Sequence, residues 1–241
     1  GGDDTTVAIE AAGALASIAH EPASLVVACR RVLAHHPANG ALWWLCSRLL
    51  AASDPWVEAR RSRDILDADG TADRLRDALP LLDDGERVAS VGFDGAVASA
   101  LERRLDLDVL AIVDPDDSTT ERRARGRAGL VEPWQLADLG TTHLLIGVRA
   151  ASPTTALVPA EARDAVFEAR GARVWLVLDA GRLLPQRLFD AVATANAADP
   201  ALTTIDTAMA AIVVGPNAVD TAADLVGRVD CPLANELLRP F

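Results

Sequence analysis

Residues able to bind or transform a small molecule follow short apolar runs in this 241-residue chain. The run at 88–91 is followed by Gly92, Phe93, Asp94 and Gly95. The glycines permit a tight turn, and a helix that starts there could offer backbone N–H groups to an anion. Such turns are also common without a ligand, with the aspartate as the helix N-cap. Two interpretations therefore stay open for this turn.

Carboxylates and guanidinium groups follow the second apolar run, at 109–113. Asp114, Asp116 and Asp117 come directly after it. Converging carboxylates could hold a divalent cation or ribose hydroxyls, whereas a solvated turn that caps the next helix is the simpler interpretation. The basic side chains of the following segment are Arg122, Arg123, Arg125 and Arg127. They could clamp a phosphate, but we expect a solvated helix face, because charge runs usually make no specific contact.

Two later runs, at 143–146 and 174–178, are followed by further candidates. Gly147 and Arg149 come after the first of them, and Arg149 could meet an anionic ligand or pair with one of the many carboxylates. Hydroxyl, carboxylate and glycine candidates further along are Ser152, Thr154, Thr155, Asp179 and Gly181. The predicted ligand-binding set is Gly92, Phe93, Asp94, Gly95, Asp114, Gly147, Arg149, Ser152 and Asp179.

The cysteines and histidines have no spacing typical of a metal site. They are Cys29, Cys46, Cys231, His20, His35, His36 and His143. An odd number of distant cysteines without a CxxC pair indicates a reducing compartment. We expect no metal, no cofactor and a cytoplasmic location. The most apolar segment, 41–52, is too short to span a bilayer and contains Arg48, so no membrane association is expected.

Two patterns of apolar residues position these candidates. Helical signals fill residues 1–84, including an apolar stripe with three- and four-residue spacing at 41–50 and a closing turn at 83–85. Short apolar runs alternating with helix-compatible segments at 96–104, 133–139 and 160–170 follow in residues 85–241, and runs at 203–205 and 209–214 could add strands. This predicts an α/β fold with an N-terminal helical part and a Rossmann-like, mainly parallel sheet. Ligands bind such sheets outside the carboxyl ends of the strands.

Composition excludes some classes of function. Half of the residues are hydrophobic, which is ample for a buried core, and the formal net charge is -12. A surface that coats nucleic acid needs a net basic face, so we expect no nucleic-acid partner.

The segment from His143 to Val177 resembles a known superfamily. It contains methylthioribose-1-phosphate isomerase, ribose-1,5-bisphosphate isomerase and the alpha, beta and delta subunits of translation initiation factor 2B. The shared pattern is a strand, a Gly-Ala-Asp-Ala-like turn, a small-residue loop, an Asn-Lys pair, a helix and a Gly-x-x-Val strand. The resemblance implies an N-terminal helical part before a Rossmann-like domain of the kind found in sugar-phosphate isomerases and coenzyme A transferases. It also implies a homodimer formed through the C-terminal domain.

The chain departs from this superfamily at the positions that carry catalysis in its isomerases. Their Thr-His-Cys-Asn turn aligns with residues 90–93, which puts Gly92 at the position of the cysteine. Their catalytic aspartate aligns with Arg149, and their Asn-Lys pair aligns with Pro159 and Ala160. Isomerisation of an aldose to a ketose needs groups that move a proton and manage an oxygen, and these substitutions remove them.

Three functions follow as hypotheses. The first is a non-catalytic member of the superfamily with a ligand-binding or regulatory role, which binds a sugar phosphate or nucleotide in a crevice around Gly92, Gly95, Gly147 and Arg149. The second is a divergent sugar-phosphate isomerase that uses Asp94, Asp114 or Asp179. The third is an assembly subunit whose crevice is filled by Phe93 or Arg149.

Overall fold

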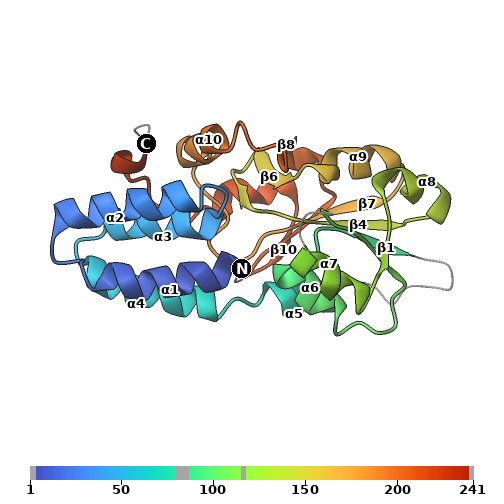
Figure 1. Ribbon diagram of the computed structural model, residues 1–241, viewed down its shortest axis with the longest axis horizontal. Coiled ribbons are helices and arrows are strands. Elements are labelled where there is room, and N and C mark those ends of the chain that lie inside the picture. The colour runs from blue at the N-terminus through green and yellow to red at the C-terminus, as the bar shows by residue number, and fades with distance from the viewer. Residues whose placement is uncertain (1–3, 80–86, 115–117, 239–241) are drawn as a thin grey trace.

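Four helices open the chain, and their ends are set by residues that cap helices or begin them. The computed structural model describes residues 4–79, 87–114 and 118–238 (Figure 1). The four helices are α1 (Asp4–Ala16), α2 (Pro22–His35), α3 (Gly40–Ala51) and α4 (Pro55–Asp67). Helices α2 and α4 begin with a proline, which lacks only an N–H that has no helical partner there. The side chains of Asn39 and Asp54 accept hydrogen bonds from the first turns of α3 and α4.

Helix α3 forms the centre of this helical layer. It is buried along most of its length, including Trp43 and Trp44, and it packs against α1, α2 and α4. The same core contains helix α10 (Gln186–Ala195) and, from the end of the described chain, Cys231 and Leu237. In Figure 1 the C-terminal segment accordingly lies beside α2 and α3. The helical layer is therefore completed by residues from the opposite end of the sequence.

The main sheet has the strand order of a Rossmann fold. Its seven strands run in the order β10-β9-β7-β4-β1-β2-β3, and all adjacent pairs are parallel except β9 and β10. The strands are β1 (Val88–Val91), β2 (Val109–Ile112), β3 (Gly129–Leu130), β4 (His143–Gly147), β7 (Arg173–Val177), β9 (Ile212–Val214) and β10 (Val219–Asp220). The chain moves outward in both directions from the adjacent strands β1 and β4, which places the switch point of the topology between them.

Both faces of this sheet are covered, as the unbroken apolar runs predict. One face packs against α5 (Thr71–Ala78), α6 (Gly95–Leu101) and α7 (Ser118–Arg125). The other packs against α8 (Leu136–Leu139), α9 (Glu161–Glu168) and a second sheet. Successive residues of a strand alternate between the two cores, as Leu145 and Ile146 of β4 do. The strand ends are therefore held rigidly between two apolar layers.

The second sheet is antiparallel and has three strands in the order β5-β6-β8. They are β5 (Ala150–Ala151), β6 (Thr155–Pro159) and β8 (Leu202–Asp206). Strand β6 starts at Thr155 and was not among the expected strands, and the expected run at 203–205 belongs to this sheet rather than to the parallel one. Because β6 ends at Pro159, it carries that residue back to the main sheet's carboxyl edge.

The predicted fold class is confirmed: an N-terminal helical part precedes a mainly parallel α/β sheet. Helix α5, near the predicted end of the helical part, packs against α6 of the sheet layer. The closing turn predicted at 83–85 lies outside the described residues. Among the helices that the structure describes, none combines the length and the apolar character needed to cross a bilayer.

Candidate functional site

A cavity opens at the switch point between β1 and β4. It has a volume of about 210 Å³ and lies where the chain leaves these strands and β2. Its lining includes Gly92 and Asp94 after β1, Asp114 after β2, Arg149 after β4 and Pro159 at the end of β6. We call it the switch-point cavity. Parallel strands place their carboxyl ends at one edge, which is why residues so far apart in sequence meet here.

Three positions that the resemblance assigns to catalysis converge in this cavity. Gly92, Arg149 and Pro159 all line it. A Cβ atom on Gly92 would come within 4.0 Å of the Pro159 ring. The alignment placed the isomerases' cysteine, aspartate and asparagine on these residues from sequence alone. These three residues therefore lie in one cavity, whereas Ala160, the remaining position of that alignment, is not among its described lining residues.

Arg149 is held by two carboxylates. Its Nη1 atom lies 2.7 Å from Oδ2 of Asp94 and 3.2 Å from Oδ2 of Asp4, at the start of α1. The side chains of Arg149 and Asp94 are only 26% and 28% exposed, so the pair is shielded from solvent more than an ordinary surface ion pair. The Asn39 side chain donates to the backbone carbonyl of Asp4 at 2.9 Å and fixes this residue beside the cavity.

The backbone of Arg149 is fixed by a close approach of α3. The N–H of Gly40 donates to the Arg149 carbonyl at 3.1 Å. A Cβ atom on Gly40 would lie 2.5 Å from that carbonyl oxygen, so no larger residue fits without a shift. The N-terminal helical layer thus positions the arginine through both its side chain and its backbone.

Carboxylates dominate the lining of the switch-point cavity. Asp94, Asp114, Glu161 and Asp199 line it, whereas Arg149 is the one guanidinium among its described lining residues. The Asp94 side chain makes no N-cap hydrogen bond to α6, so it faces the arginine instead of serving the helix. The sequence predicted an anion-suited crevice from Arg149 and the glycines. The charge of the lining instead favours a ligand without net negative charge.

The other predicted site residues lie outside this lining. Phe93 is fully buried in the core beneath α6. Ser152 is buried and accepts hydrogen bonds from the N–H groups of Thr154 and Thr155, at 3.3 and 3.0 Å, so it shapes the turn before β6. Gly147 lies next to Asp94, with Oδ1 at 3.6 Å from the position of a Cβ atom. Among the three, only Gly147 is near the cavity.

Asp179 forms a buried ion pair with Arg182 beside the cavity, and Gly95 packs against this pair. Oδ2 of Asp179 lies 2.8 Å from Nη2 of Arg182, and both side chains are almost fully buried. Arg182 also donates to the backbone carbonyl of Val148, next to Arg149. Gly95 has a φ of 50°, and a Cβ atom there would lie 2.6 Å from Oδ2 of Asp179. A glycine is therefore required at position 95, where the chain packs against the ion pair. The pair in turn supports the turn after β4 through the carbonyl of Val148.

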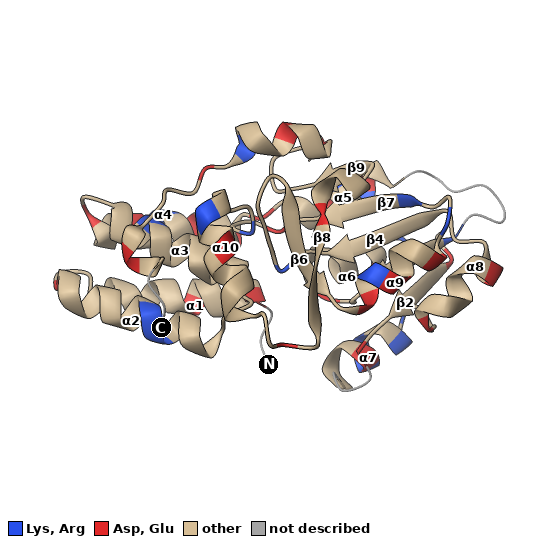
Figure 2. Cartoon of the chain, turned by 90° about the horizontal axis from the view of Figure 1, so that it is seen from above, with Lys and Arg blue, Asp and Glu red and all other residues tan. Residues whose placement is uncertain are grey.

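The arginines of α7 and its surroundings make structural contacts. Arg123 pairs with Glu102 and Arg125 pairs with Glu121. Arg127 donates to the backbone carbonyls of Leu101, Arg104 and Leu107. Acidic and basic residues are interspersed in this part of the molecule (Figure 2). Of the acidic run, Pro115, Asp116 and Asp117 lie outside the described residues, and no cluster of three or more metal-ligating side chains occurs within 4–79, 87–114 and 118–238.

The buried thiols are poor nucleophiles. Burial raises the pKa of Cys231 to about 12. The pKa of Cys46 is also raised well above its ordinary value, first by its hydrogen bond with Cys29 and then by burial. All three cysteines are free and buried in the helical layer. Because the thiolate is the reactive form, Cys46 and Cys231 are poorly suited to act as nucleophiles.

Several lining residues of the switch-point cavity escaped the sequence analysis. Glu161 comes just after β6, and Asp199 comes just before β8. The sequence did not place these two strands beside the main sheet. Asp4 reaches Arg149 from the first helix, across 145 positions of sequence. Only the contact between layers brings these carboxylates together, and no local spacing signals it.

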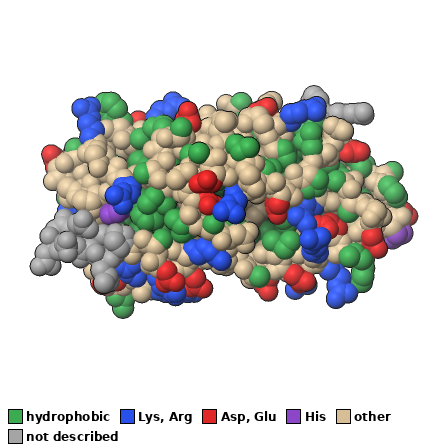
Figure 3. All heavy atoms as spheres, turned by 180° about the vertical axis from the view of Figure 1, so that it is seen from behind, with side chains coloured by type: hydrophobic (Ala, Val, Ile, Leu, Met, Phe, Trp, Pro, Cys, Tyr) green, Lys and Arg blue, Asp and Glu red, His purple; other side chains and the backbone are tan. Residues whose placement is uncertain are grey.

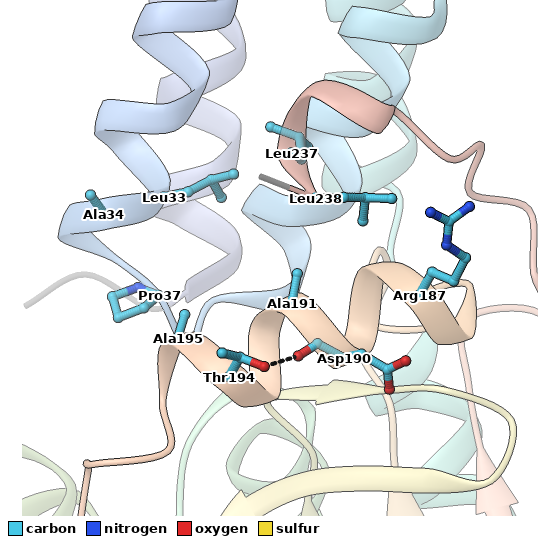
Figure 4. A pocket seen from close by; sticks show the side chains of 10 residues that line it. All are labelled: Leu33, Ala34, Pro37, Arg187, Asp190, Ala191, Thr194, Ala195, Leu237 and Leu238. Atoms are coloured by element: carbon cyan, nitrogen blue, oxygen red, sulfur yellow. Dashed lines mark hydrogen bonds between the residues drawn. The ribbon is translucent and has the colours of Figure 1, made fainter. Parts of the chain in front are cut away.

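A shallower groove of about 660 Å³ lies between the end of α2, α10 and the C-terminal segment (Figure 4). Its walls are mostly apolar, with Leu33, Pro37 and Leu237 among them. The Thr194 hydroxyl donates to the backbone carbonyl of Asp190 at 2.8 Å, within its own helix. The groove therefore offers apolar surface, with the charged side chains of Arg187 and Asp190 along its α10 side.

Solved structures share the fold of this chain. A TM-score of 0.68 with 12% identity relates it to a chain of the tetrameric eIF2B-beta2-delta2 complex from C. thermophilum, over 94% of this chain and 88% of that one. For eIF2B beta from Chaetomium thermophilum the TM-score is 0.66 with 14% identity, over 98% of this chain and 87% of that one. For the delta subunit of translation initiation factor eIF-2B from A. fulgidus the TM-score is 0.51 with 11% identity, over 93% of this chain and 85% of that one.

No protein-family model and no curated protein matches the chain in sequence. The resemblance to the initiation-factor-2B-like superfamily, inferred from residues 143–177, is confirmed at the level of the fold, over nearly the whole chain. The low identities establish the fold alone, because one fold serves many functions.

Proposed function

We propose that this chain is a non-catalytic protein of the initiation-factor-2B-like fold that acts through assembly with other protein chains. One observation carries the proposal: the Asp4, Arg149 and Asp94 side chains form an internal ion-pair cluster around the residue that the resemblance aligns with the catalytic aspartate of the isomerases. The cluster occupies the crevice with the chain's own charges. The assembly part draws on the tetrameric complex to which one of the matching structures belongs.

The chemistry of the substituted positions supports the non-catalytic part of the proposal. An isomerase needs a base for the carbon-bound proton, and arginine remains protonated in proteins. Glycine and proline have no side-chain group that transfers a proton. Asp94 and Asp114 are the carboxylates that a divergent isomerase could use instead, but Asp94 already pairs with Arg149 at 2.7 Å. Asp179 is paired with Arg182 below the turn.

A sugar phosphate or nucleotide is disfavoured as a ligand of the switch-point cavity by the same charges. It would have to displace Asp4 and Asp94 from Arg149 and to lie beside Asp114, Glu161 and Asp199. Each contact between a phosphate and these carboxylates is repulsive. We therefore expect sulfate, ribose phosphates and nucleotides all to bind weakly.

We further propose that the chain forms a homodimer through its sheet domain and works in a reducing compartment such as the cytoplasm. Hydrophobic side chains gather in several groups on the face shown in Figure 3. In the sheet domain, Trp134 and Phe167 are 65% and 61% exposed, and their elements η1 (Pro133–Gln135) and α9 are packed together. Exposed aromatic side chains of this kind are enriched at protein interfaces. The free thiols are compatible with a reducing environment.

The deciding experiment is an isomerase assay on the purified protein. Ribose 1,5-bisphosphate and methylthioribose 1-phosphate are incubated with the protein, and the products are followed by phosphorus nuclear magnetic resonance. We expect no conversion above the buffer rate. Conversion that disappears in an Asp94→Ala or Asp114→Ala variant would overturn the proposal. A thermal-shift screen of the same compounds, nucleotides and sulfate tests the ligand part, since a ligand of the native state raises the unfolding midpoint.

A further inference from the structure

A second cavity lies between the helical layer and the main sheet, at the carboxyl ends of β7 and β9. Its volume is about 280 Å³, and it shares no described lining residue with the switch-point cavity. Helices α3 and α4 form one wall, and the β9–β10 hairpin and the 3-10 helix η3 (Ala222–Arg228) form the other. We call it the Trp44 cavity, after the largest side chain that lines it.

The walls of the Trp44 cavity are apolar and rigid. Trp44, Leu178, Val213 and Leu225 line it and are at most 3% exposed, so each is fixed by packing in the protein core. Trp44 is further held by Arg48, whose guanidinium carbon lies 4.6 Å from its ring centre. An apolar cavity of this kind, with a few polar groups at its edge, is the usual form of a small-molecule site, and this volume lies near the lower end of the range, about 300 Å³.

The charged groups that line the cavity are three carboxylates and one guanidinium. Two of the carboxylates are matched by close partners. Asp220 accepts from two guanidinium nitrogens of Arg228, at 2.9 and 3.0 Å, and Asp179 pairs with Arg182 at 2.8 Å. These two pairs leave little net charge in the cavity.

The third carboxylate, Asp230, differs from them. Its Oδ1 atom accepts a hydrogen bond from Nε1 of Trp44 at 3.0 Å, and its Oδ2 atom lies 3.5 Å from Arg48. Arg48 is engaged more closely by Glu58, at 2.5 Å. One guanidinium thus serves two carboxylates, and the Asp230 side chain is 62% exposed. The edge of the cavity next to Trp44 therefore carries surplus negative charge with room for a cation.

We propose that the Trp44 cavity is a binding site for a compact organic cation, with an apolar body against Leu178, Val213 and Leu225 and an ammonium group donating to Asp230. Burial of the body in the cavity supplies affinity, and the charge-assisted hydrogen bond to Asp230 selects the charge. A neutral analogue keeps only the first contribution. An anionic analogue is repelled by Asp230 and Glu58.

The test compares three probes of similar shape: 2-phenylethylammonium, 2-phenylethanol and phenylacetate. Their dissociation constants for the intact protein are measured by isothermal titration calorimetry at one ionic strength. We expect the ammonium probe to bind about two- to fivefold more tightly than the alcohol, the difference that an ion pair with a largely exposed carboxylate makes, and phenylacetate to bind most weakly. Equal binding of the ammonium probe and the alcohol, or no binding of any probe, would overturn the proposal.

Two variants locate the binding. Asp230→Asn keeps the oxygen that accepts from Trp44 but removes the charge, and it is expected to weaken the ammonium probe about two- to fivefold while leaving the alcohol unchanged. Asp190→Asn on α10 makes the same change of net charge away from the cavity and is the matched control. Ala218→Phe, at a half-buried lining position, fills the cavity and should abolish binding of all three probes. A native circular dichroism spectrum is required of each variant. Equal weakening by the control, or binding that survives in folded Ala218→Phe, contradicts the assignment.

Discussion

Gly95 is the residue whose replacement most directly tests the support of the switch-point cavity. It has a positive φ, and the Cβ atom of an alanine would meet Asp179 at 2.6 Å. Asp179 has little room to move, because it is buried in its pair with Arg182. We expect Gly95→Ala to lower the free energy of unfolding by about 2–5 kcal/mol, from the left-handed backbone and the steric overlap together. Urea denaturation followed by circular dichroism measures it.

Gly147→Ala is the matched control for that substitution. Gly147, the last residue of β4, also lies near the cavity, but its φ is not positive. The atom nearest to an added Cβ is 3.6 Å away. Its replacement should change the free energy of unfolding by less than about 1 kcal/mol. Equal effects at the two glycines would show that the clash with the buried ion pair does not occur.

At this scale the sequence predicted those site residues that directly follow strands. Gly92, Asp94, Asp114 and Arg149 line one cavity because strand ends converge, and strand ends are visible as the limits of apolar runs. The second partner of Arg149 was not predictable in the same way. Asp4 comes from another layer of the fold, so only the packing of that layer brings it within 3.2 Å.

Whole elements were predicted where their apolar pattern is strong. Four of the central strands, β1, β2, β4 and β7, lie where unbroken apolar runs predicted them. Strand β6 was not predicted as a strand, because it is short, its first residue comes shortly after Ser152 and Pro153, and a proline ends it, and such residues favour turns. Helix α10 was not predicted either. Leu188, Phe189 and Val192 form its buried face, but the helix begins directly after Pro185, a residue that is common in loops.

The exposed aromatic pair on η1 and α9 carries the prediction for assembly. We expect the wild-type protein to sediment as a dimer and the double variant Trp134→Glu, Phe167→Glu to sediment as a monomer, with a dissociation constant at least about 100-fold higher, because buried aromatic residues dominate interface energies. Both side chains are more than half exposed, so the folded monomer should keep its stability. Analytical ultracentrifugation measures the association.

Trp56→Glu is the control for this experiment. Trp56 is an equally bulky aromatic residue, 50% exposed, but it lies on α4 in the helical layer. We expect this variant to remain a dimer. A monomeric wild-type protein, or dissociation by Trp56→Glu alone, contradicts assembly through the sheet domain.

At the scale of the whole molecule, the helical layer and the last described segment share one core. Leu237 is 1% exposed within the core that also holds Trp43, Trp44 and helix α10. The backbone is joined there too, since the Ser47 hydroxyl donates to the carbonyl of Pro232 at 2.5 Å and accepts from the N–H of Ala234 at 3.0 Å. The sequence predicted a division near residue 84. We propose that the shared core makes the two parts unfold together.

Leu237→Ala tests this cooperativity. Removing a buried leucine side chain should lower the free energy of unfolding by about 2–5 kcal/mol. If the two parts form one cooperative unit, hydrogen exchange followed by mass spectrometry will show the same loss of protection in α3 as in β4, although β4 lies in the main sheet outside this core. Leu238 is only half-buried, so Leu238→Ala should lower the free energy of unfolding by less, with the same distribution of lost protection over α3 and β4. Loss of protection confined to α1–α4 and α10, with β4 unchanged, would mean that the helical layer unfolds on its own. The internal ion-pair cluster of Asp4 and Arg149, which spans both parts, would then open without unfolding of the sheet.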